Sequence, residues 1–138
     1  MLERDAMTVL IADDDPDARD GLAQVLELML PGIRTLLAAD GLEAVTIAAD
    51  VSPWAVILDL GMPRLGGADA AHRLLERMGS ESPILIAISG DYKRLSEGYG
   101  IFDYSLRKPL DVQRLARYLS RAMVCADERA GAGRIGRA

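Results

Sequence analysis

The stretch TVLIADDDP, residues 8–16, places a short apolar run directly before three aspartates and a proline. The run lacks the alternation of a half-exposed strand, and it is typical of a central strand that is covered on both faces. Carboxylates this close together repel one another and resist ionising at the same time. The stretch therefore predicts a buried parallel strand that ends in a group of acids, and those acids need a positive counterpart.

Similar apolar runs recur along the chain and alternate with segments of helical spacing. We predict strands at 8–12, 33–38, 54–58, 84–88 and 101–106. We predict helices at 16–30, 41–50, 67–78, 91–98 and 111–124, of which the fourth is the least regular. Five strands that alternate with five helices predict an α/β doubly wound parallel sheet, in which right-handed crossovers place helices on both faces.

Capping residues and apolar spacing mark the first and last of these helices. Asp15 is expected to cap the first helix, with Pro16 at its first position, and Asp111 is expected to cap the last. One face of the first helix is predicted to carry Ala18, Leu22, Val25, Leu26 and Met29. The inward face of the last is predicted to carry Val112, Leu115, Ala116, Leu119 and Met123.

Composition limits the class of protein. The chain has 138 residues, of which 50% are hydrophobic, and this fits one folded domain, assigned to residues 7–125 and followed by a flexible tail or linker stub at 126–138. The net charge of −5 argues against direct binding to nucleic acid or to an anionic membrane. A single cysteine, Cys125, excludes an intramolecular disulfide, and the first residues do not resemble a signal peptide, so we expect a cytoplasmic protein.

The predicted strands end in residues that carry chemistry. Asp13 and Asp14 follow the first strand and Asp59 the third, while Ser89 ends the fourth and Lys108 comes soon after the fifth. Ligands of open α/β sheets bind at the carboxyl edge of the strands. Three carboxylates and one ammonium leave an excess of about two negative charges, and such an oxygen-only set favours Mg²⁺. A calcium-binding EF-hand is the competing interpretation of Asp13, Asp15 and Asp17, but the rest of that motif is absent.

Four segments of the chain are informative together: VLIADDDPDAR at 9–19, VILDLGMPRLGG at 56–67, ILIAISG at 84–90 and LRKPLD at 106–111. In their residues and in their order along the chain, they resemble a known family, the response-regulator receiver domain of two-component signalling. The resemblance covers residues 7–125. It implies a flavodoxin-like sheet with the strand order 2-1-3-4-5, as in the chemotaxis receiver that shares this fold.

The resemblance also implies roles for individual residues. Asp59 resembles the phosphoacceptor, and Asp13 and Asp14 resemble the acidic pair that holds Mg²⁺ (or Mn²⁺ as a substitute) together with Asp59 and the backbone carbonyl of Gly61. Ser89 resembles the switch hydroxyl. Lys108, followed by Pro109 through a peptide bond that is often cis in the family, resembles the lysine that pairs with the phosphoryl group.

The chain departs from the family pattern near its output face. The segment from Ser89 to Lys108 is shorter than usual and rich in glycine, so the fourth helix is expected to be short or irregular. Ser105 stands where the family commonly has a switch aromatic. The neighbouring Tyr104 could replace that aromatic only if a bulge reversed the strand register.

The expected function is that of a phosphoacceptor switch in a two-component or phosphorelay system. It is expected to catalyse only its own phosphorylation and dephosphorylation, and hence to be no enzyme in the usual sense. The partners implied are a histidine kinase or histidine phosphotransfer protein and an unknown output protein, which would bind the face formed by the fourth helix, the fifth strand and the fifth helix. A homodimer remains open, and the start at Met1 with a short tail modestly favours a stand-alone receiver.

Two other functions compete with this one. A Mg²⁺-dependent phosphatase of the haloacid-dehalogenase class also uses an aspartate at a strand end, but it needs a second aspartate where this chain has Gly61. The second competing function is that of a receiver-like binding module that is never phosphorylated. His72 is expected to be a solvent-facing residue, and Arg114, Arg117 and Arg121 form a basic stripe that is either solvated or a docking site for an acidic partner.

Overall fold

The computed structural model describes residues 7–79, 82–98 and 100–132, and it describes side chains as far as Met123. The strands are β1 (Met7–Ala12), β2 (Ile33–Ala38), β3 (Ala55–Asp59), β4 (Ile84–Ser89) and β5 (Tyr104–Arg107). The helices are α1 (Pro16–Met29), α2 (Gly41–Val51), α3 (Gly67–Met78), α4 (Tyr92–Glu97) and α5 (Val112–Ala132). The alternation of strand and helix is the predicted one.

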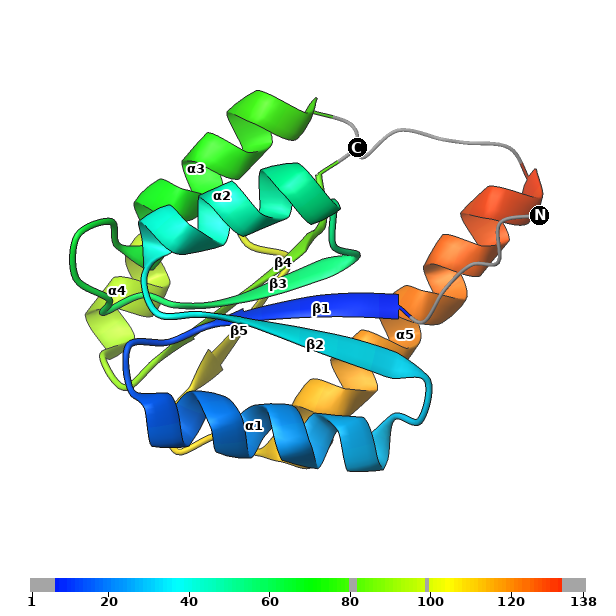
Figure 1. Ribbon diagram of the computed structural model, residues 1–138, viewed down its shortest axis with the longest axis horizontal. Coiled ribbons are helices and arrows are strands. Elements are labelled where there is room, and N and C mark those ends of the chain that lie inside the picture. Colours follow the sequence, from blue (N-terminus) through cyan, green and yellow to red (C-terminus); the bar gives the residue numbers. More distant parts are fainter. Residues whose placement is uncertain (1–6, 80–81, 99, 133–138) are drawn as a thin grey trace.

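The five strands form one parallel sheet in the order β2-β1-β3-β4-β5, which confirms the predicted topology. Helices α2 and α3 cover one face, and α1 and α5 cover the other (Figure 1). In the same view, the loops that follow β1, β2 and β3 lie together at one end of the sheet (Figure 1). This arrangement brings together the residues that end the central strands.

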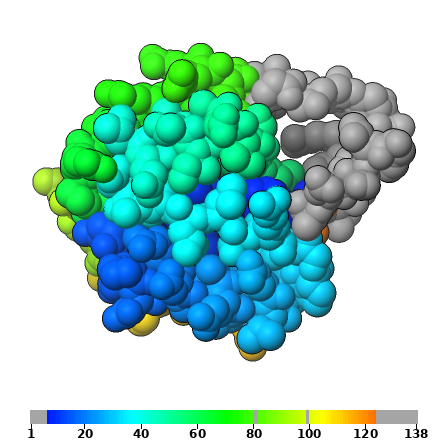
Figure 2. Space-filling view, viewed as in Figure 1, coloured from blue at the N-terminus to red at the C-terminus, as the bar shows by residue number. Residues whose placement is uncertain are grey.

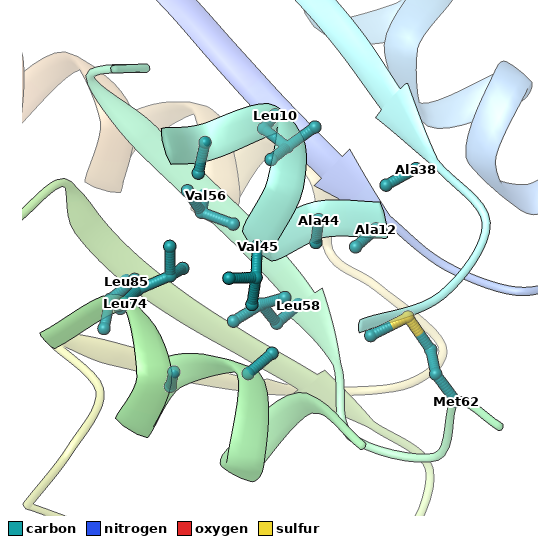
Figure 3. Packing of buried hydrophobic residues seen from close by; sticks show 13 residues of the cluster. Leu10, Ala12, Ala38, Ala44, Val45, Val56, Leu58, Met62, Leu74 and Leu85 are labelled. Carbon is teal, nitrogen blue, oxygen red and sulfur yellow. The ribbon is translucent and has the colours of Figure 1, made fainter. Parts of the chain in front are cut away.

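Apolar side chains fill the space on both sides of the sheet. One cluster, between the sheet and helices α2 and α3, includes Leu10, Val56, Leu58 and Leu74, and Met62 points into it from the loop after β3 (Figure 3). The opposite cluster lies beneath α1 and α5. The space-filling view shows that residues of α1, β2 and α2 close over β1, of which little is visible (Figure 2). The buried central strands explain why their sequences do not alternate.

The predicted caps of α1 and α5 are present, but the buried face of α1 differs from the prediction. Asp15 accepts hydrogen bonds from the amides of Asp17 and Ala18. The buried residues of α1 are Ala23 and Leu26, whereas Ala18, Val25 and Met29 are exposed. Of the predicted face, Leu26 is buried and Leu22 packs against the same cluster, so the prediction is correct for these two residues, and the contact face is rotated toward Ala23. The inward face of α5 is as predicted.

The C-terminal part of the chain contains two further differences. Helix α5 continues to Ala132, past the predicted end at residue 124, while residues 133–138 lie outside the described part. Strand β5 begins at Tyr104 because the chain turns just before it, with the amide of Ile101 bonded to the carbonyl of Gly98. Helix α4 has six residues, which confirms the predicted short fourth helix. The domain division at residue 125 stays a prediction.

Candidate functional site

The first acid of the site is fixed by the backbone around it. Asp13 follows β1 and is 3% exposed. Its amide donates to the carbonyl of Ala38 at 3.1 Å, and its Oδ1 accepts from the amide of Asp15 at 3.0 Å. Arg19, one turn into α1, donates from Nη1 to the Asp13 carbonyl at 3.0 Å. The second carboxylate oxygen of Asp13, Oδ2, faces Lys108.

Lys108 joins the ends of three strands. Its Nζ lies 3.0 Å from Oδ2 of Asp59 and 3.4 Å from Oδ2 of Asp13. Its amide donates to the carbonyl of Ser89 at 2.9 Å, and its bond to Pro109 is cis, as the family resemblance implied. Since the lysine is more than 90 residues from Asp13 in sequence, only the fold brings the two charges together.

The three acids lie close enough to share one ion. Carboxylate oxygens of Asp13, Asp14 and Asp59 all lie within 4.8 Å of one another. Asp13 and Asp59 are buried, whereas Asp14 is exposed at the mouth of the group. Oxygen donors of this kind, with water able to reach Asp14, suit a hard divalent cation that keeps part of its hydration shell. The residues therefore fit the Mg²⁺ that the resemblance implied.

The charges in the group affect one another. Burial raises the pKa of the Asp13 carboxyl above its ordinary value, and the negative charge of Asp59 raises it further. Burial lowers the pKa of Lys108, but the hydrogen bond and charge of Asp59, with the charge of Asp13, outweigh this and raise it overall. The group therefore keeps a protonated lysine, while one of its acids resists ionisation.

The neighbouring strand ends complete the site. The Asp59 carboxylate accepts from the amide of Gly61 through Oδ1 at 3.0 Å, which leaves Oδ2 toward Lys108. Ser89 is 3% exposed, and its Oγ accepts from the amide of Asp91, the N-cap of α4, at 3.0 Å. A Cβ on Gly67 would lie 2.7 Å from the carbonyl oxygen of Asp59, so only glycine lets α3 begin this close to β3. Every residue proposed for the site thus lies at one edge of the sheet.

The region of the missing switch aromatic is regular. Strand β5 pairs with β4 without a bulge, with Tyr104 opposite Ile86 and Ser105 opposite Ala87. The Tyr104 ring stacks on Tyr118 of α5, with ring centroids 4.3 Å apart. Because adjacent residues of a strand point to opposite faces, Tyr104 does not take the place of an aromatic at Ser105.

Three charged residues near the site were not singled out from the sequence. Asp40 caps α2, is 5% exposed and pairs with Arg64 of the loop after β3. Arg94 of α4 donates to the carbonyl of Leu60 at 3.1 Å. The sequence AADG before α2 is a signal for the cap at Asp40, but nothing local indicates its partner.

The surface residues singled out from the sequence are exposed as expected. His72 lies on the solvent side of α3, and Arg114, Arg117 and Arg121 lie on the solvent side of α5. Among the helices of residues 7–79, 82–98 and 100–132, none combines the length and the apolar character needed to cross a bilayer.

Comparisons with known proteins agree with this geometry. A family described as the response regulator receiver domain matches residues 9–120. The positive alginate biosynthesis regulatory protein of Pseudomonas aeruginosa is 36% identical over 118 residues, which cover 84% of this chain and 47% of that protein. Response regulator MprA of Mycobacterium sp. (strain KMS) is 39% identical over 83 residues, which cover 60% of this chain and 35% of that protein. The chain thus spans less than half the length of either relative.

Solved structures give the same result. The REC domain of AraT, a response regulator from Geobacillus stearothermophilus, is 26% identical with a TM-score of 0.78 and covers 91% of this chain and 98% of that one. The signal receiver domain of a DNA binding response regulator from Colwellia psychrerythraea is 26% identical with a TM-score of 0.76, covering 85% and 98%. The family match and the relatives agree with the acids and the lysine that meet at the edge of the sheet. This chain belongs to the family of response regulator receiver domains.

Proposed function

We propose that the domain accepts a phosphoryl group on Asp59 from a phosphohistidine of a histidine kinase or histidine phosphotransfer protein. One observation carries this proposal: the buried Asp59 lies within 3.0 Å of Lys108, inside a group of acids that could share one cation. An isolated capping aspartate would not need such neighbours. The assignment of each site residue is inferred from its position and its chemistry.

In the proposed step, a carboxylate oxygen of Asp59 attacks the phosphorus of the phosphohistidine. An O–P bond forms as the P–N bond breaks, and the imidazole nitrogen leaves with the electron pair. Negative charge on the transferring group must be neutralised, and Lys108 supplies a fixed positive charge on one side. The product is an acyl phosphate, a mixed anhydride that water can later hydrolyse.

The proposed metal ligands are the carboxylates of Asp13, Asp14 and Asp59 and the carbonyl of Gly61. Mg²⁺ at this position, or Mn²⁺ in its place, would neutralise the phosphoryl oxygens opposite Lys108. Without such a cation the three carboxylates outnumber the one lysine, and an incoming phosphoryl group would add to the repulsion. The protein's part is to hold these oxygens at one edge and to exclude water from Asp13 and Asp59.

We propose that phosphorylation of Asp59 changes the conformation at the start of α4. Phosphorylation gives Asp59 roughly −1.5 to −2 charge and new acceptor oxygens, toward which the Ser89 hydroxyl can turn as a donor. The Ser89 Oγ at present accepts from the Asp91 amide, so this turn would disturb the N-cap of α4. The face formed by α4, β5 and α5 would then bind an output protein or a second copy of the domain. The basic stripe Arg114, Arg117 and Arg121, exposed on α5, would suit an acidic partner.

This proposal makes the domain a switch that catalyses only its own phosphorylation and dephosphorylation. We place it in the cytoplasm, where kinases draw on ATP, and we expect no direct contact with nucleic acid. A phosphatase acting on free substrates is disfavoured because Gly61, two residues after Asp59, has no side chain to act as a general acid.

The test is intact-mass spectrometry after incubation with acetyl phosphate, with Mg²⁺ or with EDTA. We expect one added phosphoryl group on the wild type with Mg²⁺ and none on Asp59→Asn. An unmodified wild type, tested also with a phosphorylated histidine donor, would support the binding-module alternative. Steady release of phosphate from many small phosphoesters would instead support the phosphatase.

A further inference from the structure

A second ion pair lies beside the site, between two loops that are distant in sequence. Arg64, in the loop between β3 and α3, donates from Nη2 to Oδ2 of Asp40. The other carboxylate oxygen of Asp40 accepts from the amide of Glu43 at 2.8 Å, which caps α2. The side chain of Asp40 is 8% exposed, so both oxygens of a buried carboxylate have a donor. Asp40 thus joins the start of α2 to the loop after β3.

The backbone of Arg64 adopts a conformation that is unusual for its residue type. Its φ is +64°, in the left-handed region that glycine and asparagine favour. A residue other than glycine persists there when neighbouring contacts hold it. In this chain Leu65 follows directly, and a Cβ on Gly41 would overlap the Leu65 carbonyl oxygen. The loop after β3 is therefore in direct contact with the first turn of α2.

The same loop is anchored from inside. Met62 is 6% exposed and packs in the cluster that includes Ala12, Ala38 and Ala44 (Figure 3). Ala38 also accepts the amide hydrogen bond of Asp13, so the loop packs against the strand end that positions the first acid. Gly61, whose amide bonds to Asp59, lies between Asp59 and this anchor.

We propose that Asp40 and Arg64 are positioning residues, and that their ion pair holds the loop after β3 so that Gly61 stays in place beside Asp59. Gly61 is exposed and has no side chain, so its position depends on what holds the loop on either side. Neither Asp40 nor Arg64 belongs to the group of three acids. This inference rests on the proposed function, because it makes the pair act on cation binding through Gly61.

The test compares Mg²⁺ binding to four variants by isothermal titration. Arg64→Gln removes the positive charge of the pair. Asp40→Asn removes the negative charge and retains an acceptor for the cap of α2. We expect each to weaken Mg²⁺ binding about fivefold, less than the tenfold or more that is typical when a direct hydrogen bond to a ligand is lost. Arg64→Lys should restore part of the affinity. Arg73→Gln, at an exposed arginine of α3, is the matched control and should bind as the wild type does.

A second measurement needs neither cation nor phosphoryl donor. Hydrogen exchange of the Gly61 amide, followed by NMR without Mg²⁺, should be faster in Arg64→Gln and Asp40→Asn than in the wild type and the control. Unchanged Mg²⁺ affinity in both variants would overturn this inference alone, since the wild type would still bind the cation. A wild type that binds no Mg²⁺ would overturn both the metal site of the proposed function and this inference.

Discussion

At the scale of single residues, the acids of the site oppose the stability of the fold that presents them. Asp13 is buried beside Asp59, and both effects raise the pKa of its carboxyl. A raised carboxyl pKa means that the folded state binds the proton more tightly than the unfolded chain does. The contribution of Asp13 to the free energy of unfolding therefore falls as the pH rises above its ordinary pKa of 3.8. Lys108 offsets part of this repulsion but carries only one charge.

A bound cation should relieve the repulsion that remains. We expect millimolar Mg²⁺ to raise the melting temperature, because a ligand at about 100 times its Kd stabilises a protein by about 2.7 kcal/mol. Asp14→Ala should abolish this rise, and because Asp14 is exposed, the substitution should leave the fold intact. Thermal melting followed by circular dichroism checks both. An equal Mg²⁺ shift in Asp14→Ala would reject Asp14 as a ligand.

The pKa of the Asp40 carboxyl is shifted in the opposite direction to that of Asp13. The amide of Glu43 lowers the pKa of the Asp40 carboxyl, and the hydrogen bond and charge of Arg64 lower it further. Its contribution to stability is therefore complete above pH 3.8, the ordinary value, and is lost as the pH falls below it.

Thermal melting of the wild type and of Asp40→Asn at a series of pH values tests whether the charge of Asp40 stabilises the fold. Asp40→Asn keeps a cap but loses the charge, so it should cost about 0.2–1 kcal/mol near pH 6, as expected for an ion pair with one exposed partner. The difference between the wild type and Asp40→Asn should shrink toward pH 3. A difference that grows on acidification would show that the charge of Asp40 does not stabilise the fold.

At the scale of elements, two glycines of the helices should respond oppositely to the same substitution. A Cβ on Gly21, in the middle of α1, meets nothing within 4 Å, so Gly21→Ala should stabilise the protein by about 0.5–1 kcal/mol. Gly41→Ala, at the start of α2, should destabilise it by about 1–3 kcal/mol because the new methyl group overlaps the loop after β3. Urea unfolding of both variants measures the difference. Destabilisation by Gly21→Ala, or tolerance of Gly41→Ala, would contradict the packing described.

Local patterns predicted most elements because their causes are local. The apolar runs and the caps at Asp15 and Asp111 depend on neighbouring residues, and they mark where β1, α1 and α5 begin. The buried face of α1 was predicted only in part, with Leu22 and Leu26 correct and Ala23 missed, because it depends on how the helix lies against the sheet. The extension of α5 to Ala132 was missed because small residues and glycine give no apolar period to follow.

The candidate site was predictable to a similar degree. Strand ends gave Asp13, Asp59 and Lys108, because a parallel sheet places the ends of its strands at one edge. The pairing of Asp40 with Arg64 could not be predicted in this way. It joins residues 24 apart through two loops, and it depends on the backbone of Arg64 in a conformation that the sequence does not indicate.

At the scale of the whole molecule, the strand order makes the site possible. Strands β1 and β3 are neighbours at the centre of the sheet, so Asp13 and Asp59 end side by side, and β4 and β5 follow outward with Ser89 and the approach to Lys108. Helices cover both faces of the sheet, and the proposed phosphoryl donor would therefore approach at the edge where the strands end (Figure 1). The fold thereby brings together the proposed nucleophile, the ammonium group of Lys108 and the proposed metal ligands from distant parts of the chain.

The most direct test locates the phosphoryl group on the chain. After incubation with acetyl phosphate and Mg²⁺, borohydride reduces an acyl phosphate of aspartate to homoserine, which peptide mass spectrometry can place. We predict homoserine at position 59 alone, with Asp13 and Asp14 unmodified. Homoserine at 13 or 14, or an acid-labile phosphate on His72 with Asp59 unchanged, would contradict the account.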